Sequence, residues 1–274
     1  MKNILCLILL LSFTLSSCVK NASASNENGT QSVVSKDDKT IVPTGKTVKE
    51  RFNPPTGYER VSTADNPFGE YLRNLKLKSY GSPVLYFNKK QKPNNGVYVS
   101  VVDMEIDSQD LQQCADAVMR LRGEFLYEQK KFDKIHFNIV SDNKPRYFLS
   151  YTNGNTSYTK FRAYMRYVFA YANTASLHDE LTPVKKIDDI RAGDVFVQKR
   201  SPYGHAVAVV DVAINSKTGK KVYLLAQSYM PAQETQILAN PANKSISPWY
   251  EAKNGAVQTP EWTFTSSDLR RFKE

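Results

Sequence analysis

The pattern of apolar and polar positions divides the chain into three stretches. An almost unbroken apolar run extends from Ile4 to Leu15, directly after a short positively charged start. Residues 19–46 are rich in Asn, Ser, Thr and Lys and contain few large apolar side chains. From residue 48 onward, apolar residues recur with helical and strand periodicity. The pattern therefore predicts an apolar leader, a flexible polar segment and a single folded domain over residues 48–274.

Apolar residues at helical spacing predict three helices in the domain, over residues 65–75, 108–126 and 158–177. The second has the strongest pattern, and its apolar face includes Cys114. Asp107 or Ser108 is the expected N-cap of that helix. In the first helix, Asn66 is the expected N-cap and Pro67 occupies the first turn.

Short apolar or alternating runs between turn-forming residues predict the strands. They cover residues 82–87, 96–104, 134–140, 146–151, 194–198, 205–212 and 221–228, with a further extended run at 234–238. The strands at 205–212 and 221–228 enclose a turn-forming loop, so they should form an antiparallel hairpin. Helices come first and a series of strands follows, which predicts the α+β class.

The leader ends in Leu15-Ser16-Ser17-Cys18, which resembles the lipobox of bacterial lipoproteins. The resemblance implies a signal peptide at 1–17, a lipid on Cys18 and a tether over residues 18–47. The expected location is the cell envelope, with the protein anchored to the outer membrane on its periplasmic or surface face. The alternative is an ordinary cleavage site with an incidental cysteine. No later stretch has the roughly 18 apolar residues that a spanning helix requires.

The formal net charge of +10 favours a partner that carries carboxylates or phosphates, such as an anionic envelope polymer or peptide. The alternative is that the basic charge only keeps the protein soluble. The sequence has no block of Arg and Lys interleaved with aromatic residues, so we do not expect nucleic acid as a partner. His-Glu-x-x-His spacing is also absent, and we expect neither a metal nor another cofactor.

Cys114 is the one thiol expected in the mature domain, because Cys6 leaves with the signal peptide and Cys18 carries the lipid. A disulfide within the domain is therefore excluded. A single cysteine in an exported protein is either reactive or simply buried in the core. Of the three histidines, His136 alternates within a strand and His178 stands at a polar helix end. His205, at the start of a strand after Gly204, is the best-placed candidate base, and the alternative is an ordinary exposed histidine at a strand end.

Two phrases, Gly193-Asp194-Val195-Phe196-Val197 and Gly204-His205-Ala206-Val207-Ala208-Val209-Val210, resemble the Gly-Asp strand and the histidine strand of NlpC-type papain-like peptidases. The resemblance implies a papain-like fold in which a cysteine-bearing helix packs on an antiparallel sheet. It also implies Cys114 as nucleophile, His205 as base and Gln227, on the next strand, as the third member. Asp211 lies roughly 20 Å along the strand from His205, which excludes it from the triad.

The hairpin geometry adds a second argument for this site. A loop centred on Lys217 would place His205 and Gln227 on one face of the hairpin, within about 4.5–8 Å of each other. The Cys114 helix would then have to pack on that face, with the sulfur about 3–5 Å from the ring. In the peptidases the cysteine follows an aspartate at the very start of its helix, whereas the expected N-cap leaves Cys114 about a turn inside.

The chain also resembles an uncharacterised lipoprotein family that is known only as a domain of unknown function. The distinctive phrases lie at residues 110–117 and 225–233, and the resemblance spans residues 50–274. The sequence thus predicts a lipid-anchored cysteine hydrolase that cleaves an amide bond in an envelope peptide, for example a peptidoglycan stem. The alternative is a binding or scaffolding lipoprotein of the same fold without catalysis. Thiol reactivity at mildly acidic pH would separate the two.

Overall fold

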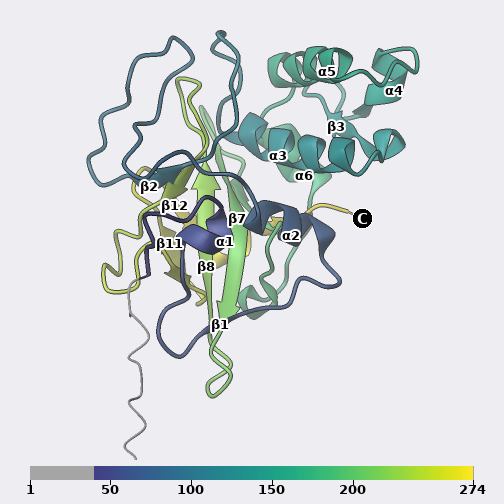
Figure 1. Ribbon diagram of the computed structural model, residues 1–274. Helices are drawn as coiled ribbons and strands as arrows, with labels where there is room; N and C mark the ends of the chain where they lie inside the picture. The colour runs from purple at the N-terminus through teal and green to yellow at the C-terminus, as the bar shows by residue number, and fades with distance from the viewer. Residues whose placement is uncertain (1–39, 274) are drawn as a thin grey trace, which may run out of the picture. The chain divides into compact units, whose positions relative to one another are not determined.

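The computed structural model describes residues 40–273, so the expected signal peptide and Cys18 lie outside the described residues. Within this range the protein is a mixed α+β unit around a nine-stranded sheet (Figure 1). The main path of the sheet runs β2-β9-β8-β7-β6-β13-β5, and its strands pair antiparallel. These strands are β2 (Tyr98–Val101), β9 (Gln236–Leu238), β8 (Lys221–Gln227), β7 (His205–Ile214), β6 (Val195–Gln198), β13 (Leu269–Arg271) and β5 (Thr182–Pro183).

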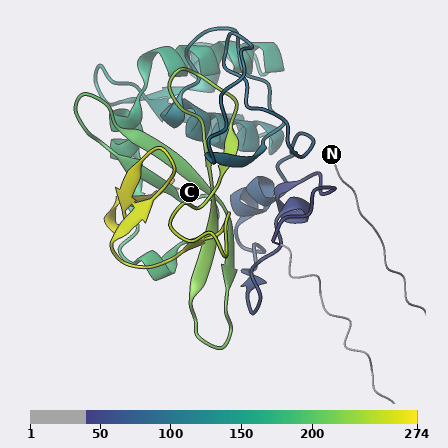
Figure 2. The ribbon, with the colours of Figure 1, turned by 90° about the vertical axis from the view of Figure 1, so that its left-hand side faces the viewer.

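Two very short strands extend the central hairpin: β1 (Glu59–Arg60) pairs with β7, and β10 (Tyr250–Glu251) pairs with β8. Two further hairpins stand apart from the large sheet. They are formed by β3 (His136–Asn138) with β4 (Pro145–Tyr147), and by β11 (Ala256–Gln258) with β12 (Thr263–Thr265). Figure 2 shows the β11–β12 hairpin, in yellow, beside the long green β7–β8 hairpin.

The helices precede most of the sheet in the chain. They are α1 (Val48–Arg51), α2 (Pro67–Arg73), α3 (Cys114–Glu128), α4 (Phe148–Tyr151), α5 (Tyr158–Tyr171) and α6 (Thr174–Glu180), with 3₁₀ turns at Phe132–Lys134, Ile187–Asp189 and Ser266–Asp268. Helices α3, α5 and α6 lie together at one end of the β7–β8 hairpin (Figure 1). Among residues 40–273, none of the helices is long and apolar enough to cross a membrane.

The central strands are apolar on both faces because both faces of the sheet are covered. Along β7, Ala206 and Ala208 belong to the apolar cluster that also contains the apolar residues of α3 and α5. The alternate residues Val207 and Val209 belong to a second cluster, together with Phe264 of β12. The sheet is therefore packed between helices on one face and the β11–β12 hairpin, with neighbouring loops, on the other.

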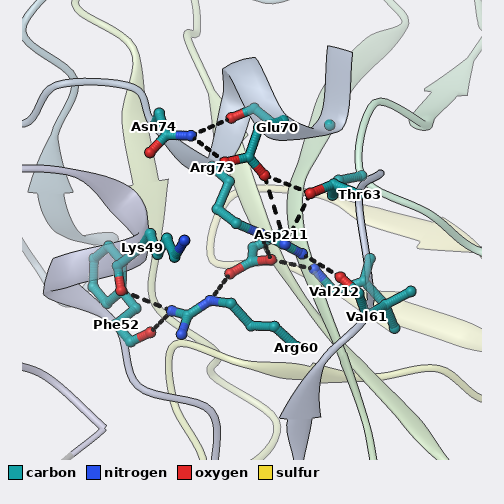
Figure 3. Close-up of polar contacts among 12 residues, drawn as sticks. Lys49, Phe52, Arg60, Val61, Thr63, Glu70, Arg73, Asn74, Asp211 and Val212 are labelled. Carbon is teal, nitrogen blue, oxygen red and sulfur yellow. Dashed lines mark hydrogen bonds and ion pairs between the residues drawn. The ribbon is translucent and has the colours of Figure 1, made fainter. Parts of the chain in front are cut away.

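A β-bulge interrupts the β7–β8 pairing between Val209 and Asp211. Beyond the bulge, the carboxylate of Asp211 is fully buried and accepts hydrogen bonds from two arginines (Figure 3). Arg73 of α2 donates from Nε at 2.7 Å, and Arg60 of β1 donates from Nε at 2.8 Å. Arg73 also bonds the carbonyl of Val61, so one carboxylate fastens α2 and the preceding loop to the sheet.

Several expected elements are confirmed and others are wrong in informative ways. Asn66 caps α2 as expected, with its side chain accepting from the amide of Gly69. The helix expected over 158–177 is interrupted because Asn173 caps a new helix, α6, through the amides of Ala175 and Ser176. The strand expected at 146–151 is wrong, since β4 ends at Tyr147 and α4 follows.

The beginning of the described chain is tied to the domain. Ile41 forms an isolated bridge with Phe52, and Thr47 forms one with Lys76. The hydroxyl of Thr47 also caps α1 by accepting from the amide of Glu50. The residues just before position 48 are thus part of the packed unit.

Candidate functional site

Cys114 is the first residue of α3, and the N-cap expected at Asp107 or Ser108 is wrong. Tertiary contacts hold the preceding residues outside the helix. The carboxylate of Asp110 accepts from the amide of Ala232 at 2.6 Å, and the hydroxyl of Ser228 donates to the carbonyl of Gln112 at 3.2 Å. Cys114 therefore stands at the helix N-terminus, where the peptidase pattern has its cysteine.

The N-terminus of α3 is capped by a hydrogen bond to the side chain of its third residue. Gln113 is the N-cap, and its backbone N–H donates to a carboxylate oxygen of Asp116 at 3.0 Å. Burial raises the pKa of Asp116 well above its usual range. The second carboxylate oxygen of Asp116 is buried and has no hydrogen-bond partner among the described residues.

The Cys114 thiol is buried, with 7% of the residue exposed. Its sulfur lies 3.9 Å from the hydroxyl of Thr174, and the backbone amides of Ala115 and Ala206 also point toward it. Burial raises the pKa of the thiol, and the nearby charge of Asp116 adds to the rise. The resting thiol is therefore protonated at neutral pH.

Glycine is needed where the start of α6 meets the sheet. A Cβ at Gly204 would lie 2.1 Å from the carbonyl oxygen of Gln198 and 2.9 Å from the Thr174 methyl group. The absence of a side chain at Gly204 lets Thr174 approach the beginning of β7, which brings it to Cys114. The glycine before His205 thus has a packing reason.

His205 and Gln227 are brought together as the sequence predicted. Nε2 of His205 lies 2.9 Å from Oε1 of Gln227, and both residues are at most 2% exposed. Nδ1 of His205 forms no hydrogen bond with any residue from 40 to 273. Burial lowers the pKa of His205 to about 4, with a smaller raising contribution from Gln227. The imidazole is therefore neutral over most of the physiological range.

Three aromatic rings surround His205. Phe264 stacks on it with ring centroids 5.6 Å apart, while Trp262 and Tyr229 lie at 5.3 and 4.9 Å. Because Phe264 belongs to the cluster on the hairpin side of the sheet, the imidazole points to that face. These rings account for its burial.

The thiol lies close to the backbone at the start of β7, but it forms no bond with the imidazole of His205. The sulfur lies by the amide of Ala206, the residue that follows His205, and forms no hydrogen bond with the imidazole in the described chain. Helix α3 packs on the face to which Ala206 points, which is the face opposite the imidazole. The expectation that the Cys114 helix packs on the face of the hairpin that carries His205 and Gln227 is therefore wrong, because the imidazole lies with Phe264 on the other face. The expected sulfur-to-nitrogen separation of about 3–5 Å stays a prediction.

The polar contacts of Gln227 extend to two residues that sequence reasoning missed. Nε2 of Gln227 donates to Oε2 of Glu261 at 2.6 Å, and Nζ of Lys92 lies 2.8 Å from both oxygens of Glu261. Lys92 also donates to Oε1 of Gln233 at 2.9 Å. Glu261 lies in the turn between β11 and β12, and Lys92 lies in a long loop, so neither belongs to a recognisable motif.

A cavity of about 890 Å³ opens elsewhere, between α3, β3 and α6. Within it, Glu180 accepts from the amide of Asn138 at 2.8 Å and lies 3.6 Å from Nδ1 of His136. Burial raises the pKa of Glu180 to about 7. His178 instead pairs with Asp179 at 2.8 Å.

A model of the family described as "Domain of unknown function (4846)" matches residues 48–271 of the chain. No curated protein and no solved structure matches significantly. The match covers the sheet, α3 and the contacts of His205.

Proposed function

We propose that this chain, which belongs to the family of the domain of unknown function 4846, is a lipid-anchored cysteine hydrolase of the cell envelope. In this proposal Cys114 attacks an amide carbonyl, His205 moves the proton and Gln227 orients His205. The fold would then be a papain-like variant, with a cysteine-bearing helix packed on an antiparallel sheet. The observation that carries the proposal is the buried His205–Gln227 pair beside a helix-N-terminal cysteine.

The chemistry follows from the two protonation states. Because the thiol pKa is raised and the imidazole pKa is lowered, the resting pair is neutral rather than an ion pair. The S–H proton would pass to Nδ1 of His205 as the sulfur electron pair attacks the carbonyl carbon. The same proton would then go to the departing amine, and water would hydrolyse the thioester. Backbone N–H groups at the start of α3 would stabilise the oxyanion.

The thiol rests beside Thr174 on the α3 face of the sheet, and the imidazole lies on the other face. The proposal therefore requires the start of α3 to shift around the end of β7, where His205 is the first residue, when substrate binds. Catalytic hydrogen bonds are often long or absent in ligand-free enzymes and form in the substrate complex. A carboxylate-rich envelope peptide, such as a peptidoglycan stem, suits the net charge of +10. The lipobox-like Leu15-Ser16-Ser17-Cys18 supports placing the enzyme at a membrane.

The test is release of amine from purified envelope peptides. Cys114→Ala and His205→Gln should each abolish release, while His178→Gln, a change of the same type at a partly exposed histidine, should leave it intact. The rate should fall below about pH 4, as His205 becomes protonated. Undiminished release by Cys114→Ala would sink the proposal.

A second function, binding without catalysis, is favoured by the burial of Cys114 and by its bond to Thr174. In that case Cys114 would be a small core residue. Cys114→Ala would then cost about 1–3 kcal/mol of unfolding free energy, and the wild type would release no amine from any envelope peptide.

A further inference from the structure

A chain of polar side chains leads from His205, on one face of the sheet, to the β11–β12 turn that covers the same face. Its bonds run from His205 Nε2 to Gln227 Oε1 at 2.9 Å, and from Gln227 Nε2 to Glu261 Oε2 at 2.6 Å. Lys92 closes the chain by contacting both oxygens of Glu261 at 2.8 Å and Oε1 of Gln233 at 2.9 Å. The two inner members, Gln227 and Glu261, each contact one side chain of the chain on either side.

Donor and acceptor rules fix the direction of every bond in this chain. The Glu261 carboxylate, paired with the ammonium of Lys92, can only accept, so Gln227 must turn its NH₂ group toward it. The carbonyl oxygen of Gln227 then faces His205, and it too can only accept. Nε2 of His205 must therefore carry the ring hydrogen, and Nδ1 of the neutral ring keeps its lone pair.

Burial makes the reversed arrangement costly. Gln227 is 1% exposed and His205 2%, and Trp262 and Phe264 pack against the imidazole. A flipped amide would set the carbonyl oxygen of Gln227 against the carboxylate of Glu261, where little water could compensate. Leaving buried polar groups mismatched is unfavourable, and more so when one of them carries a charge.

We propose that Glu261 is a positioning residue: through Gln227 it fixes His205 in the Nε2–H tautomer, so that Nδ1 is the basic nitrogen. The role rests on the proposed hydrolase function for its purpose, but the tautomer itself does not depend on it. Lys92 holds Glu261 in place and neutralises its charge. Glu261 touches neither the thiol nor the reacting atoms in this scheme, and it acts only through Gln227.

Glu261→Gln provides an isosteric test with an expected reversal. Lys92 can only donate, so it should retain the oxygen of the new amide and leave the new NH₂ group facing Gln227. Gln227 would then turn its oxygen to that group and its own NH₂ to His205. Nε2 would become the acceptor, and the hydrogen would move to Nδ1. A base with its hydrogen on the wrong nitrogen should lower kcat by roughly 10²- to 10⁴-fold.

The measurement is the pair of imidazole ¹⁵N resonances of His205 in the full-length, ¹⁵N-labelled protein at pH 7. The chain has three histidines, so assignment by substitution is direct. The wild type should show a protonated Nε2, and Glu261→Gln a protonated Nδ1. The double variant Gln227→Glu/Glu261→Gln restores the donor–acceptor order and should restore the Nε2–H tautomer. Glu251→Gln, at a glutamate exposed on β10, controls for the lost charge.

The outcomes separate this inference from the function proposed above. A tautomer that is unchanged in folded Glu261→Gln would overturn the role of Glu261, whatever the activity. A reversed tautomer, rescued by the double variant, would support it even if the wild type released no amine from any peptide. If Glu261→Gln did not fold, Glu261→Ala would replace it. With no carboxylate to accept from its NH₂ group, Gln227 could present either end to the imidazole, and the same resonances should then show both tautomers.

Discussion

Glu180 shows how a single buried carboxylate can make stability depend on pH. Burial raises its pKa to about 7, against 4.5 for the unperturbed side chain. Between these values the folded protein keeps a proton that the unfolded chain has lost. Its contribution to stability is therefore fully present below about pH 4.5 and is lost as pH rises through about 7. The full loss corresponds to about 3 kcal/mol.

We expect Glu180→Gln to remove this dependence. The amide oxygen can still accept from Asn138, so the cavity should keep its shape. The free energy of unfolding of the variant minus that of the wild type should rise by about 3 kcal/mol between pH 4 and pH 8. Urea unfolding of both proteins at both pH values measures this difference. Glu251→Gln, at an exposed position, should show no such difference. If the free energy of unfolding changed with pH equally in wild type and Glu180→Gln, Glu180 would not be the source of the pH dependence.

At the same scale, the sequence predicted two of the contacting site residues but not the rest of their network. His205 and Gln227 could be found because each lies on a strand of a recognisable hairpin. Glu261 is 34 residues beyond Gln227, in a turn between two three-residue strands. Lys92 lies in a loop rich in Lys, Pro and Asn. Such loops are placed by tertiary contacts, which local patterns do not encode.

At the scale of elements, the β7–β8 hairpin places His205 and Gln227 on one face, as predicted, but it does so through a β-bulge that the sequence did not reveal. Near the turn, Ile214 pairs with Lys221, a register that would place His205 and Gln227 on opposite faces. The bulge between Val209 and Asp211 shifts the pairing, so that both point to one face. The predicted loop centre thus gave the right face, although the register it assumed does not hold at the turn.

The start of α3 was mispredicted for a related reason. The helical spacing of apolar residues extends back to Leu111, but Asp110 and Gln112 are held by the segment from Ser228 to Ala232. Tertiary hydrogen bonds outweigh helix propensity over so short a stretch, since propensity differences are a few tenths of a kcal/mol per residue. The result places Cys114 at the helix start, which the periodicity alone argued against.

The Asp211 cluster makes a prediction about how elements are joined. Arg73 is 5% exposed at its side chain and Asp211 is fully buried. Asp211→Asn would therefore leave the buried guanidinium with only the more distant carboxylate of Glu70, 4.0 Å away. We expect a loss of about 3–5 kcal/mol in the free energy of unfolding, read from the urea midpoint at pH 7. Asp142→Asn, which breaks the exposed pair with Arg146, should change the midpoint little. A small effect of Asp211→Asn would mean that Arg73 finds other partners.

At the scale of the whole molecule, the main question is whether the domain works at a membrane. Cys18 lies outside the described residues, and no helix within residues 40–273 could span a bilayer. In our proposal the acyl chains on Cys18 provide the attachment, each buried CH₂ contributing roughly 0.8 kcal/mol. The net charge of +10 would add attraction to anionic lipids, but salt would screen that part.

The anchoring proposal therefore predicts that Cys18→Ala removes both the lipid and salt-resistant membrane binding. Labelled palmitate should enter the wild type, which should partition into the detergent phase and remain there in high salt. Cys18→Ala should incorporate no label and should leave the membrane fraction when ionic strength rises, because only screened charge attraction would remain. Cys6→Ala is the matched control, since Cys6 would be removed with the signal peptide and labelling should persist. Salt-resistant anchoring of Cys18→Ala would show that another part of the chain holds the membrane.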